Sequence, residues 1–408
     1  MKQGTTYSRI ASFGLFLFAV SLPISHVPTQ LGIGVAFLAR LSGSIRSRNW
    51  TFHWHALFLP LVAYIGWNVV AAALSERPDH SLGAVLDNEW PLLIMVSLYW
   101  IVESERELGS LVKVFLAASS VAVIYAVWQS VGGVELYRGV RLDPMGWGFY
   151  RAVGFYGFYL TFAAFAMTVF LYSSSFALEM KKWPYAVLAG LSFVAVIATF
   201  ARSIWISLAA AIPLFAFTKG RKAGIVVVGA LVVLGVGGIL SVPALRNRAE
   251  SIISPGQNET RLNLWKTAIE MSKDHPVFGV GEDNWDHHFE RYRVNGFYDT
   301  TVHPHNDYLT VLVSSGIPGL IAFVSTWLVA LGGGIRLIRS ARTPPIRAIA
   351  MASTFSLMGL MIGGLFQNYY GTFVNCLGWW FVVGLLLSAE RLDRELKNSV
   401  APAEKGAE

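Results

Sequence analysis

Long apolar runs separated by short polar segments dominate the chain. Many of these runs reach the roughly 18–20 residues that a helix needs to cross the hydrocarbon core of a bilayer. The candidate spans are 9–25, 28–42, 55–74, 89–104, 109–131, 152–174, 184–200, 203–218, 223–242, 308–333, 346–366 and 372–390. Because backbone groups in lipid must be satisfied within their own segment, the pattern predicts an all-α polytopic membrane protein with about 12 transmembrane helices.

One long polar segment, 243–307, interrupts this pattern between the ninth and tenth spans. Its apolar residues recur at helical spacing: Leu262, Leu264, Trp265, Ala268 and Met271. Asn258 or Thr260 could cap that helix. We therefore expect transmembrane helices 1–9 in 1–242, a small helical loop domain carrying catalytic residues in 243–307, transmembrane helices 10–12 in 308–390 and a tail in 391–408.

Composition supports a membrane location. Of the 408 residues, 54% are hydrophobic and 14% are charged, whereas soluble proteins average about 25% charged residues. The first apolar run has a basic flank, Lys2 and Arg9, like a signal peptide, but no small-residue cleavage site follows it, so we expect an uncleaved helix. The single cysteine, Cys376, excludes a disulfide within the chain and a cysteine-based metal site.

The placement of charge predicts the orientation in the membrane. With both termini in the cytoplasm, most of the 32 Lys and Arg residues fall in cytoplasmic loops, as the positive-inside rule requires. The tail is then cytoplasmic, and the 243–307 segment lies on the periplasmic face. The net charge of +7 therefore reflects membrane topology and does not indicate nucleic-acid binding.

A few arginines break the rule and become candidate binding residues. Arg138, Arg141 and Arg151 lie in one aromatic-rich outer loop, Arg202 lies between two apolar runs, and Arg261 opens the loop helix. A charge at the bilayer centre costs about 2.5–3.5 kcal/mol on insertion scales, and guanidinium groups suit bidentate phosphate contacts. The alternative is that these arginines extend to lipid headgroups.

The stretch "TTVHPHNDYLTVLVSSG", residues 300–316, places two histidines at the edge of an apolar run. Neutral imidazole is the usual general base near neutral pH, which makes His303 and His305 candidates. Asn306 and Asp307 have a simpler interpretation, because either could cap the helix that begins near Tyr308. Capping does not explain the two histidines.

No metal site or cofactor is predicted. The segment "GVGEDNWDHHFE" gathers Glu282, Asp283, Asp286, His287 and His288, but their spacing matches no known type of site, and a solvated loop face is the better interpretation. The chain also lacks a nucleotide-binding signature, a nucleophile elbow and a cysteine nucleophile.

Three motifs together resemble one family. They are "FARSIW", "RLNLWKTAIEMSKDHPVFGVGEDNW" and "HPHNDYLTVLVSSGIPGL". In this order and spacing they are similar to the O-antigen ligase and O-antigen polymerase (Wzy-type) superfamily of bacterial inner-membrane glycosyltransferases, most like the ligases. The resemblance is strongest over about 195–320.

The resemblance implies a GT-C-type fold and a metal-independent, inverting transfer on the periplasmic face. The donor would be a glycan on undecaprenyl diphosphate, and the acceptor a sugar hydroxyl of lipid A-core in lipopolysaccharide biosynthesis. Arg202, Arg261 and His305 match the family's functional positions, and His303 matches less well. The arginines would hold the diphosphate, assisted by Arg151, Arg138 and Arg141, with His305 as base and Asn306 as a further substrate contact.

Three other functions remain open. An O-antigen polymerase would share the chemistry, and a protein O-oligosaccharyltransferase would use a protein hydroxyl as acceptor. A transporter without chemistry is disfavoured, because the sequence has neither an inverted repeat nor paired broken helices.

Overall fold

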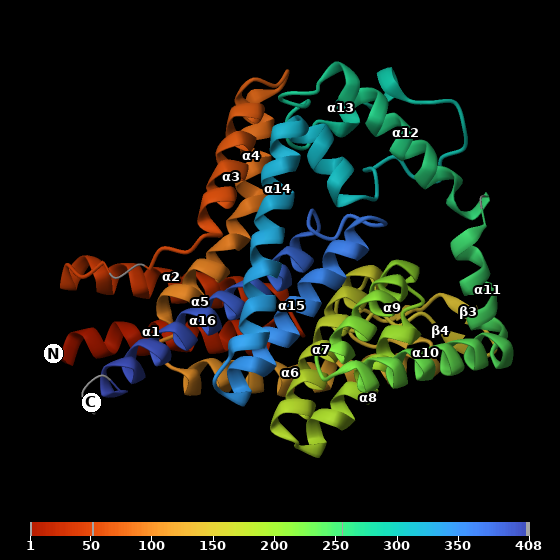
Figure 1. Ribbon diagram of the computed structural model, residues 1–408. Coiled ribbons are helices and arrows are strands. Elements are labelled where there is room, and N and C mark those ends of the chain that lie inside the picture. The colour runs from red at the N-terminus through yellow and green to blue at the C-terminus, as the bar shows by residue number, and fades with distance from the viewer. Residues whose placement is uncertain (1, 51–52, 255, 405–408) are drawn as a thin grey trace.

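The computed structural model describes residues 2–50, 53–254 and 256–404, which fold mainly into helices (Figure 1). The α-helices are α1 (Lys2–Ser21), α2 (His26–Ser47), α3 (Phe58–Ala73), α4 (Pro78–Glu89), α5 (Leu93–Ile101), α6 (Glu105–Gly132), α7 (Tyr159–Met180), α8 (Trp183–Ala198), α9 (Arg202–Phe217), α10 (Arg221–Ser241), α11 (Pro243–Ile253), α12 (Glu259–Asp274), α13 (Trp285–Tyr292), α14 (Asp307–Ser340), α15 (Pro344–Gly364) and α16 (Phe373–Glu404). The short elements are the 3₁₀ helices η1 (Trp90–Leu92) and η2 (Gly256–Asn258) and the antiparallel pairs β1 (Val134–Glu135) with β2 (Val140–Arg141) and β3 (Pro144–Gly146) with β4 (Phe149–Tyr150). The helical class is therefore confirmed, with two small hairpins added.

Among the described residues, six helices are long and apolar enough to cross a membrane: α6, α7, α10, α14, α15 and α16. Three shorter apolar helices accompany them, namely α3, α8 and α9. These helices indicate a multi-pass membrane protein. The count of twelve spans and the GT-C assignment stay predictions.

The fourth expected span, 89–104, has the wrong boundaries. The helical path already begins with α4 at Pro78 and passes through η1 into α5, which ends at Ile101. Pro91 lies within η1. Because proline has no N–H to donate, the chain tightens there into a 3₁₀ turn. The apolar run alone therefore located the second half of a longer, interrupted helix.

The helix α14 is kinked, and the kink provides a docking point for the preceding segment. Gly316 has φ 67° and ψ −170°, outside helical geometry. Pro318, which cannot donate to the carbonyl of Ser314, follows it. Two freed carbonyls find partners outside the helix: Val280 N–H donates to Val313 (2.8 Å) and Gly281 N–H to Ser314 (3.0 Å).

Two further backbone groups at the kink also find hydrogen-bond partners outside α14. Ile317 N–H donates to the Pro276 carbonyl (2.8 Å), and the Trp67 indole of α3 donates to the Ser315 carbonyl (2.8 Å). The kink thus joins α3, α14 and the chain between α12 and α13. Since buried backbone groups must be paired, these bonds fix where that chain lies.

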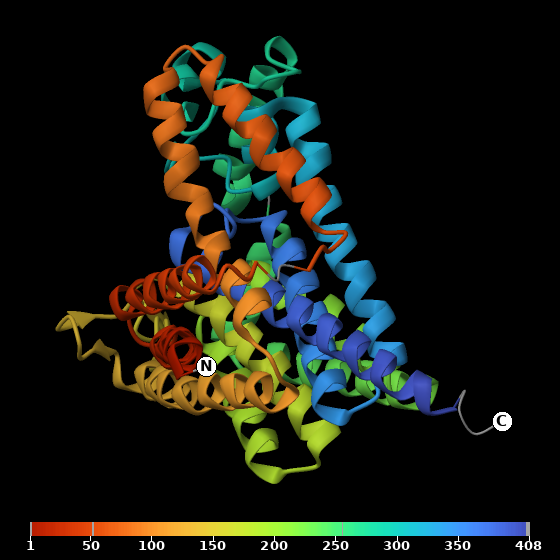
Figure 2. The ribbon, with the colours of Figure 1, turned by 90° about the vertical axis from the view of Figure 1, so that its left-hand side faces the viewer.

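We call residues 259–306, which include α12 and α13, the cap. Both ribbon views place it at one end of the molecule, beside the upper end of α14 (Figures 1 and 2). The cap has its own apolar core, in which the buried face of α12 (Leu264, Ala268 and Met271) packs with Trp285 and Phe289 of α13. The helical spacing seen in the sequence is therefore confirmed for these three positions.

Candidate functional site

A cleft, which we call the arginine cleft, lies between α9, α11 and α12, and its volume is about 320 Å³. Volumes of roughly 300–1,000 Å³ are usual for small-molecule sites. Its lining joins two of the predicted arginines to residues from four parts of the chain: Arg202, Ser203, Ile206, Ile252, Asn258, Arg261, Leu262, Trp265 and Phe366. One face of α12 thus packs in the cap core, and another face, with Arg261 and Trp265, lines the cleft.

Arg202 is the first residue of α9 and follows a sharp break in the chain, where Phe200 has φ 54°. Its guanidinium donates to the backbone carbonyl of Ser251 and lies 3.3 Å from the Ser251 hydroxyl. No ion pair with a carboxylate engages it within the described residues. The positive charges of Arg261 and Arg151 act on it instead.

Arg261 lies in the first turn of α12 and is half-buried. In the part of the chain that the structure describes, its guanidinium has neither a hydrogen bond nor an ion pair, and its Nε is buried without a partner. Burial lowers the pKa of Arg261, although the group remains charged at neutral pH. A buried, unpaired cation in a cleft is costly unless an anion binds there.

Arg248 is a third cation of this group that the sequence analysis did not single out. It lies on α11, its Nε donates to the Phe200 carbonyl (2.8 Å), and burial, with a further contribution from Arg202, lowers its pKa to about 10. Its sequence context, "RNRAE", resembles an ordinary solvated helix. The packing of α11 against α9 places it near Arg202, although Arg248 itself does not line the cleft.

Arg151 lies at the edge of this group. It lies 3.2 Å from Asp143 and stacks on the ring of Tyr159, whose centroid is 4.2 Å from the guanidinium carbon. Its charge acts on both Arg202 and Arg248. Arg151 is thus close enough to contribute to the positive potential of the cleft, but a carboxylate already pairs with it.

The other two arginines of the outer loop do not join the group. Arg138 forms an ion pair with Glu135, three residues earlier, and reaches the Phe155 carbonyl at 3.5 Å. Arg141 is exposed on β2. Neither residue lines the cleft. Their assignment as substrate contacts therefore remains a prediction without geometric support.

His305 lies beside the cleft in a left-handed conformation, with φ 51°, which non-glycine residues seldom adopt. Its Nδ1 is 3.0 Å from the Oε1 of Gln367. Because an amide oxygen can only accept, Nδ1 carries the proton and Nε2 keeps its lone pair. Burial, with a smaller contribution from the charge of Arg261, lowers the pKa of His305 below its usual value, so the ring is neutral at pH 7.

His303 supports the backbone of His305. Its Nδ1 accepts the His305 N–H at 3.1 Å, and the two ring centroids are 4.2 Å apart. Burial, followed by the effect of His305, lowers the pKa of His303 to about 4. A ring that must stay neutral and whose Nδ1 accepts a backbone bond is suited to positioning its neighbour. This geometry favours His305 over His303 as the base.

The capping interpretation of the following residues is confirmed. The Asn306 side chain accepts from Leu309 N–H at 3.0 Å, and its amide donates to the Leu365 carbonyl at 2.9 Å. Asp307, only 2% exposed, accepts from Tyr370 N–H at 2.9 Å. Both side chains are therefore committed to fastening the start of α14 to the segment after α15. The role of Asn306 as a substrate contact stays a prediction.

The prediction that Asn258 or Thr260 caps α12 through its side chain was wrong. Asn258 stands at the N-cap position of α12 but makes no capping bond. Its side-chain amide instead donates to the carbonyls of Ser251, Ile252 and Ser254 at the end of α11. Thr260 lies inside the helix. Asn258 therefore closes the preceding helix and thereby shapes the wall of the cleft.

The segment between α15 and α16 was missed from sequence, although it forms one side of the site. Phe366 lines the cleft, Gln367 holds His305, and the Tyr369 hydroxyl is 2.7 Å from the Ser203 hydroxyl. The run "FQNYYG" contains several polar residues between two apolar runs, a signal comparable to that of "HPHND". It could have been found by searching every span boundary for buried polar types.

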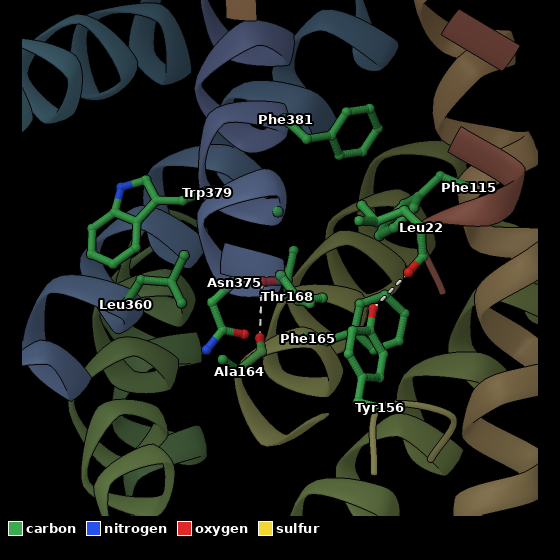
Figure 3. Close-up of a pocket in the computed structure, with 12 residues that line it drawn as sticks. Leu22, Phe115, Tyr156, Ala164, Phe165, Thr168, Leu360, Asn375, Trp379 and Phe381 are labelled. Carbon is green, nitrogen blue, oxygen red and sulfur yellow. Dashed lines mark hydrogen bonds between the residues drawn. The ribbon is translucent and has the colours of Figure 1, made fainter. Parts of the chain in front are cut away.

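A second cavity lies in the helical core, among α1, α6, α7, α15 and α16 (Figure 3). Its volume is about 20 Å³, and its lining is mostly apolar. Two hydroxyl groups drawn there have backbone partners: the Tyr156 hydroxyl donates to the Leu22 carbonyl (2.8 Å) and the Thr168 hydroxyl to the Ala164 carbonyl (3.1 Å). The Trp379 indole nitrogen is buried without a partner among the described residues. With no cation in its lining, this cavity does not suit an anionic substrate.

The residues of the "GEDNWDHHFE" segment separate in space. Glu282 points inward and accepts from the Asn88 amide at 2.9 Å, whereas Asp283 lies 3.2 Å from His80. His287 and His288 face Glu76 instead. The cluster considered from sequence is thus not one site, and its two histidines acquire a partner that precedes them by about two hundred residues.

Two comparisons with known proteins bear on this site. Residues 187–324 match the protein family described as O-Antigen ligase. The chain is also similar to an O-antigen ligase of Pseudomonas aeruginosa, with 26% identity over 309 residues, which cover 75% of this chain and 70% of that protein. The family match contains Arg202, Arg248, Arg261 and His305. These findings confirm the resemblance inferred from the three sequence motifs.

Proposed function

Because this chain is a relative of the O-antigen ligases, we propose that it transfers a glycan from undecaprenyl diphosphate to a sugar hydroxyl of lipid A-core during lipopolysaccharide biosynthesis. One observation carries the proposal. Arg202 and Arg261 line a cleft without carboxylate partners among the described residues, and a neutral His305 with a free Nε2 lies beside them.

The arginines act on the donor. A diphosphate is a good leaving group, but the negative charge that develops on its departing oxygen must be stabilised. Arg202 and Arg261 provide two guanidinium groups for this purpose, and Arg248 adds charge behind them. Such charges are most effective when they are fixed in place before the reaction and shielded from water, as they are in a partly buried cleft.

His305 acts on the acceptor. Its Nε2 takes the proton of the acceptor hydroxyl while the hydroxyl oxygen attacks the anomeric carbon. The bond from that carbon to the diphosphate oxygen breaks, and the diphosphate leaves with the electron pair. One displacement of this kind inverts the anomeric centre. Gln367 keeps the proton on Nδ1 throughout, so Nε2 remains the basic atom.

The location of the cleft agrees with a lipid-linked donor. Arg202 begins α9, an apolar helix, and Trp265 and Phe366 lie on the cleft wall. A diphosphate headgroup could bind between the arginines while its polyprenyl chain stays in lipid. We place this face on the periplasmic side of the inner membrane, on the basis of the distribution of Lys and Arg along the sequence.

Reconstitution tests the proposal. The purified protein in liposomes is given an undecaprenyl-diphosphate glycan with lipid A-core, and the products are separated by gel electrophoresis. We expect glycan on lipid A-core and released undecaprenyl diphosphate. Longer lipid-linked glycans without modified core would instead indicate a polymerase, and transfer only to an added protein would indicate a protein O-oligosaccharyltransferase. Movement of intact donor without any transfer would indicate a transporter.

A further inference from the structure

Three side chains that can bind a metal meet where the cap contacts α3 and α4. Glu76 lies in the turn between α3 and α4, and His287 and His288 lie on α13. The Nε2 atoms of His287 and His288 lie 3.2 Å and 4.0 Å from the Glu76 Oε2. One ligand atom from each residue lies within 4.8 Å of the other two.

His288 gives a second, independent reason to expect a ligand. It is only 3% exposed, and its Nε2 is buried without a hydrogen-bond partner, although it faces Glu76. A buried polar nitrogen without a partner is costly and requires an explanation. A metal ion between the three groups would supply that partner.

The types of ligand define the class of ion. Two imidazoles and a carboxylate suit Zn²⁺ and neighbouring divalent transition metals, and Mg²⁺ and Ca²⁺ prefer oxygen ligands throughout. Glu76 and His287 are exposed, so both can turn the short distance needed to reach bond lengths of about 2.0–2.2 Å. A water molecule would complete a four-coordinate ion.

We propose that Glu76, His287 and His288 form a binding site for Zn²⁺ or a similar divalent transition metal, which fastens α13 of the cap to the turn between α3 and α4. None of the three lines the arginine cleft. In Figure 1, α13 lies beside the upper ends of α4 and α14, whereas α9 and α11 lie lower, on the right-hand side. The site is therefore structural and separate from the transfer chemistry.

The surrounding contacts agree with a fastening role. The Ser81 hydroxyl donates to the Glu282 carbonyl (2.8 Å), and the Asn88 amide donates to the Glu282 carboxylate (2.9 Å). Gly281 is so close to this turn that a Cβ atom there would lie 2.5 Å from the Ser75 Cβ. The metal would thus complete an interface that α4 and the cap already share.

Metal binding to the full-length purified protein tests the inference. The affinity tag is removed, the protein is treated with EDTA and dialysed, and Zn²⁺ alone is added. We expect one equivalent of tightly bound Zn²⁺ by elemental analysis, a higher melting temperature, and slower hydrogen exchange in α13. Co²⁺ should give the visible absorption bands of a four-coordinate site.

The variants Glu76→Gln and His287→Ala change exposed side chains and so should fold even if His288→Ala does not. Each should weaken Zn²⁺ binding by more than the roughly 10–100-fold that loss of a supporting partner costs. His80→Ala is the matched control, because His80 belongs to the same interface but pairs with Asp283. It should bind Zn²⁺ like the parent.

Binding that is equally tight in the parent, Glu76→Gln and His287→Ala would identify an adventitious ion only and overturn the inference, as would the absence of stoichiometric binding in the parent. The outcome is independent of the proposed transferase activity, because binding and hydrogen exchange are measured without substrate. Arg202 variants that lose transfer should still bind Zn²⁺.

Discussion

At the scale of single residues, His305 illustrates how a functional side chain is prepared by its neighbours. Its left-handed backbone is held by the bond from its N–H to His303, and its ring by Gln367. Non-glycine residues in this conformation carry strain of about 1–3 kcal/mol, which persists only where the surroundings enforce it. The strain therefore points to a functional reason for the position of this ring.

Replacing the base should abolish transfer. His305→Ala removes the only Nε2 that we assign to the acceptor proton, and general-base catalysis contributes roughly 10²–10⁴-fold to rates. We expect a loss of that size in reconstituted liposomes, with normal membrane insertion. The control is His275→Ala, in the cap but outside the proposed mechanism. Near-parental transfer by His305→Ala would eliminate His305 as the base.

The pH dependence of transfer should report the ionisation of His305. Because burial lowers its pKa, the acidic limb of the rate profile should lie below the usual histidine value of about 6.5. Gln367→Glu places a carboxylate beside Nδ1, which stabilises the protonated ring and should move that limb to higher pH. Gln367→Leu has no charge to stabilise the protonated ring, so it should not move the limb in that direction. It should lower the rate of transfer, because the His305 ring loses the hydrogen bond that orients it.

An unchanged acidic limb in Gln367→Glu, measured from pH 5 to 9 at saturating donor, would show that His305 is not the group that titrates.

The arginines can be tested by conservative exchange. Arg202→Lys keeps the charge but loses the planar fork that can bind two phosphate oxygens. We expect at least a tenfold loss of transfer, measured as release of undecaprenyl diphosphate. Arg221→Lys, at the exposed start of α10 and outside the cleft, is the matched control and should retain activity. If both variants worked equally well, contact with lipid headgroups would be the better account of Arg202.

At the scale of secondary-structure elements, the kink in α14 connects the cap to the membrane helices. A straight α14 would pair the Ile317 N–H with the Val313 carbonyl in its own ladder, and the cap would lose the two backbone bonds that these groups make to Pro276 and Val280. His305 immediately precedes this helix. A change in the kink should therefore move the cap and the start of α14, and with them His305.

Gly316→Ala tests the kink. A Cβ atom at Gly316 would lie 2.2 Å from the Val277 carbonyl oxygen, and φ is 67° there. Either the cap must move or the kink must straighten, at a cost of about 1–3 kcal/mol. We expect faster hydrogen exchange and proteolysis in 276–300. Gly332→Ala on the same helix, where the nearest neighbouring atom is 3.9 Å away, should have no such effect.

At the scale of the whole molecule, the distribution of charge predicts which membrane face carries the candidate site. Most Lys and Arg residues lie in the loops that we assign to the cytoplasm. We therefore expect the cap, the arginine cleft and His305 to lie at the opposite, periplasmic face. A lipid-linked diphosphate presents its headgroup at a membrane surface, so a site at that level can receive it without moving the charge through lipid.

Thiol labelling tests this orientation. Cys376 is buried, so it should give little background. Exposed single cysteines at Asn295 in the cap and at Lys222 at the start of α10 should react from opposite sides of the membrane. A reagent that cannot cross the membrane should label Asn295→Cys in intact spheroplasts and Lys222→Cys only after permeabilisation. The reverse result would invert the topology.

The sequence by itself determined the helical class and the apolar helices, and it predicted the chemical groups of the candidate site. These follow from local rules: an apolar run of sufficient length must form a helix in lipid, and a charge beside such a run must be compensated. Arg202, Arg261 and His305 could be identified from their immediate neighbours alone. The length of an apolar run did not reveal the interruption at Pro91.

Only the tertiary structure decided which of these groups act together. Gln367 meets His305 from 62 residues away, Arg248 comes near Arg202 through the packing of α11, and Glu76 meets two histidines of α13. In each pair the residues come from different elements, and their contact depends on how whole helices pack. No local pattern in the sequence encodes these contacts, because the free energy that brings such residues together comes from the burial of the apolar surfaces around them.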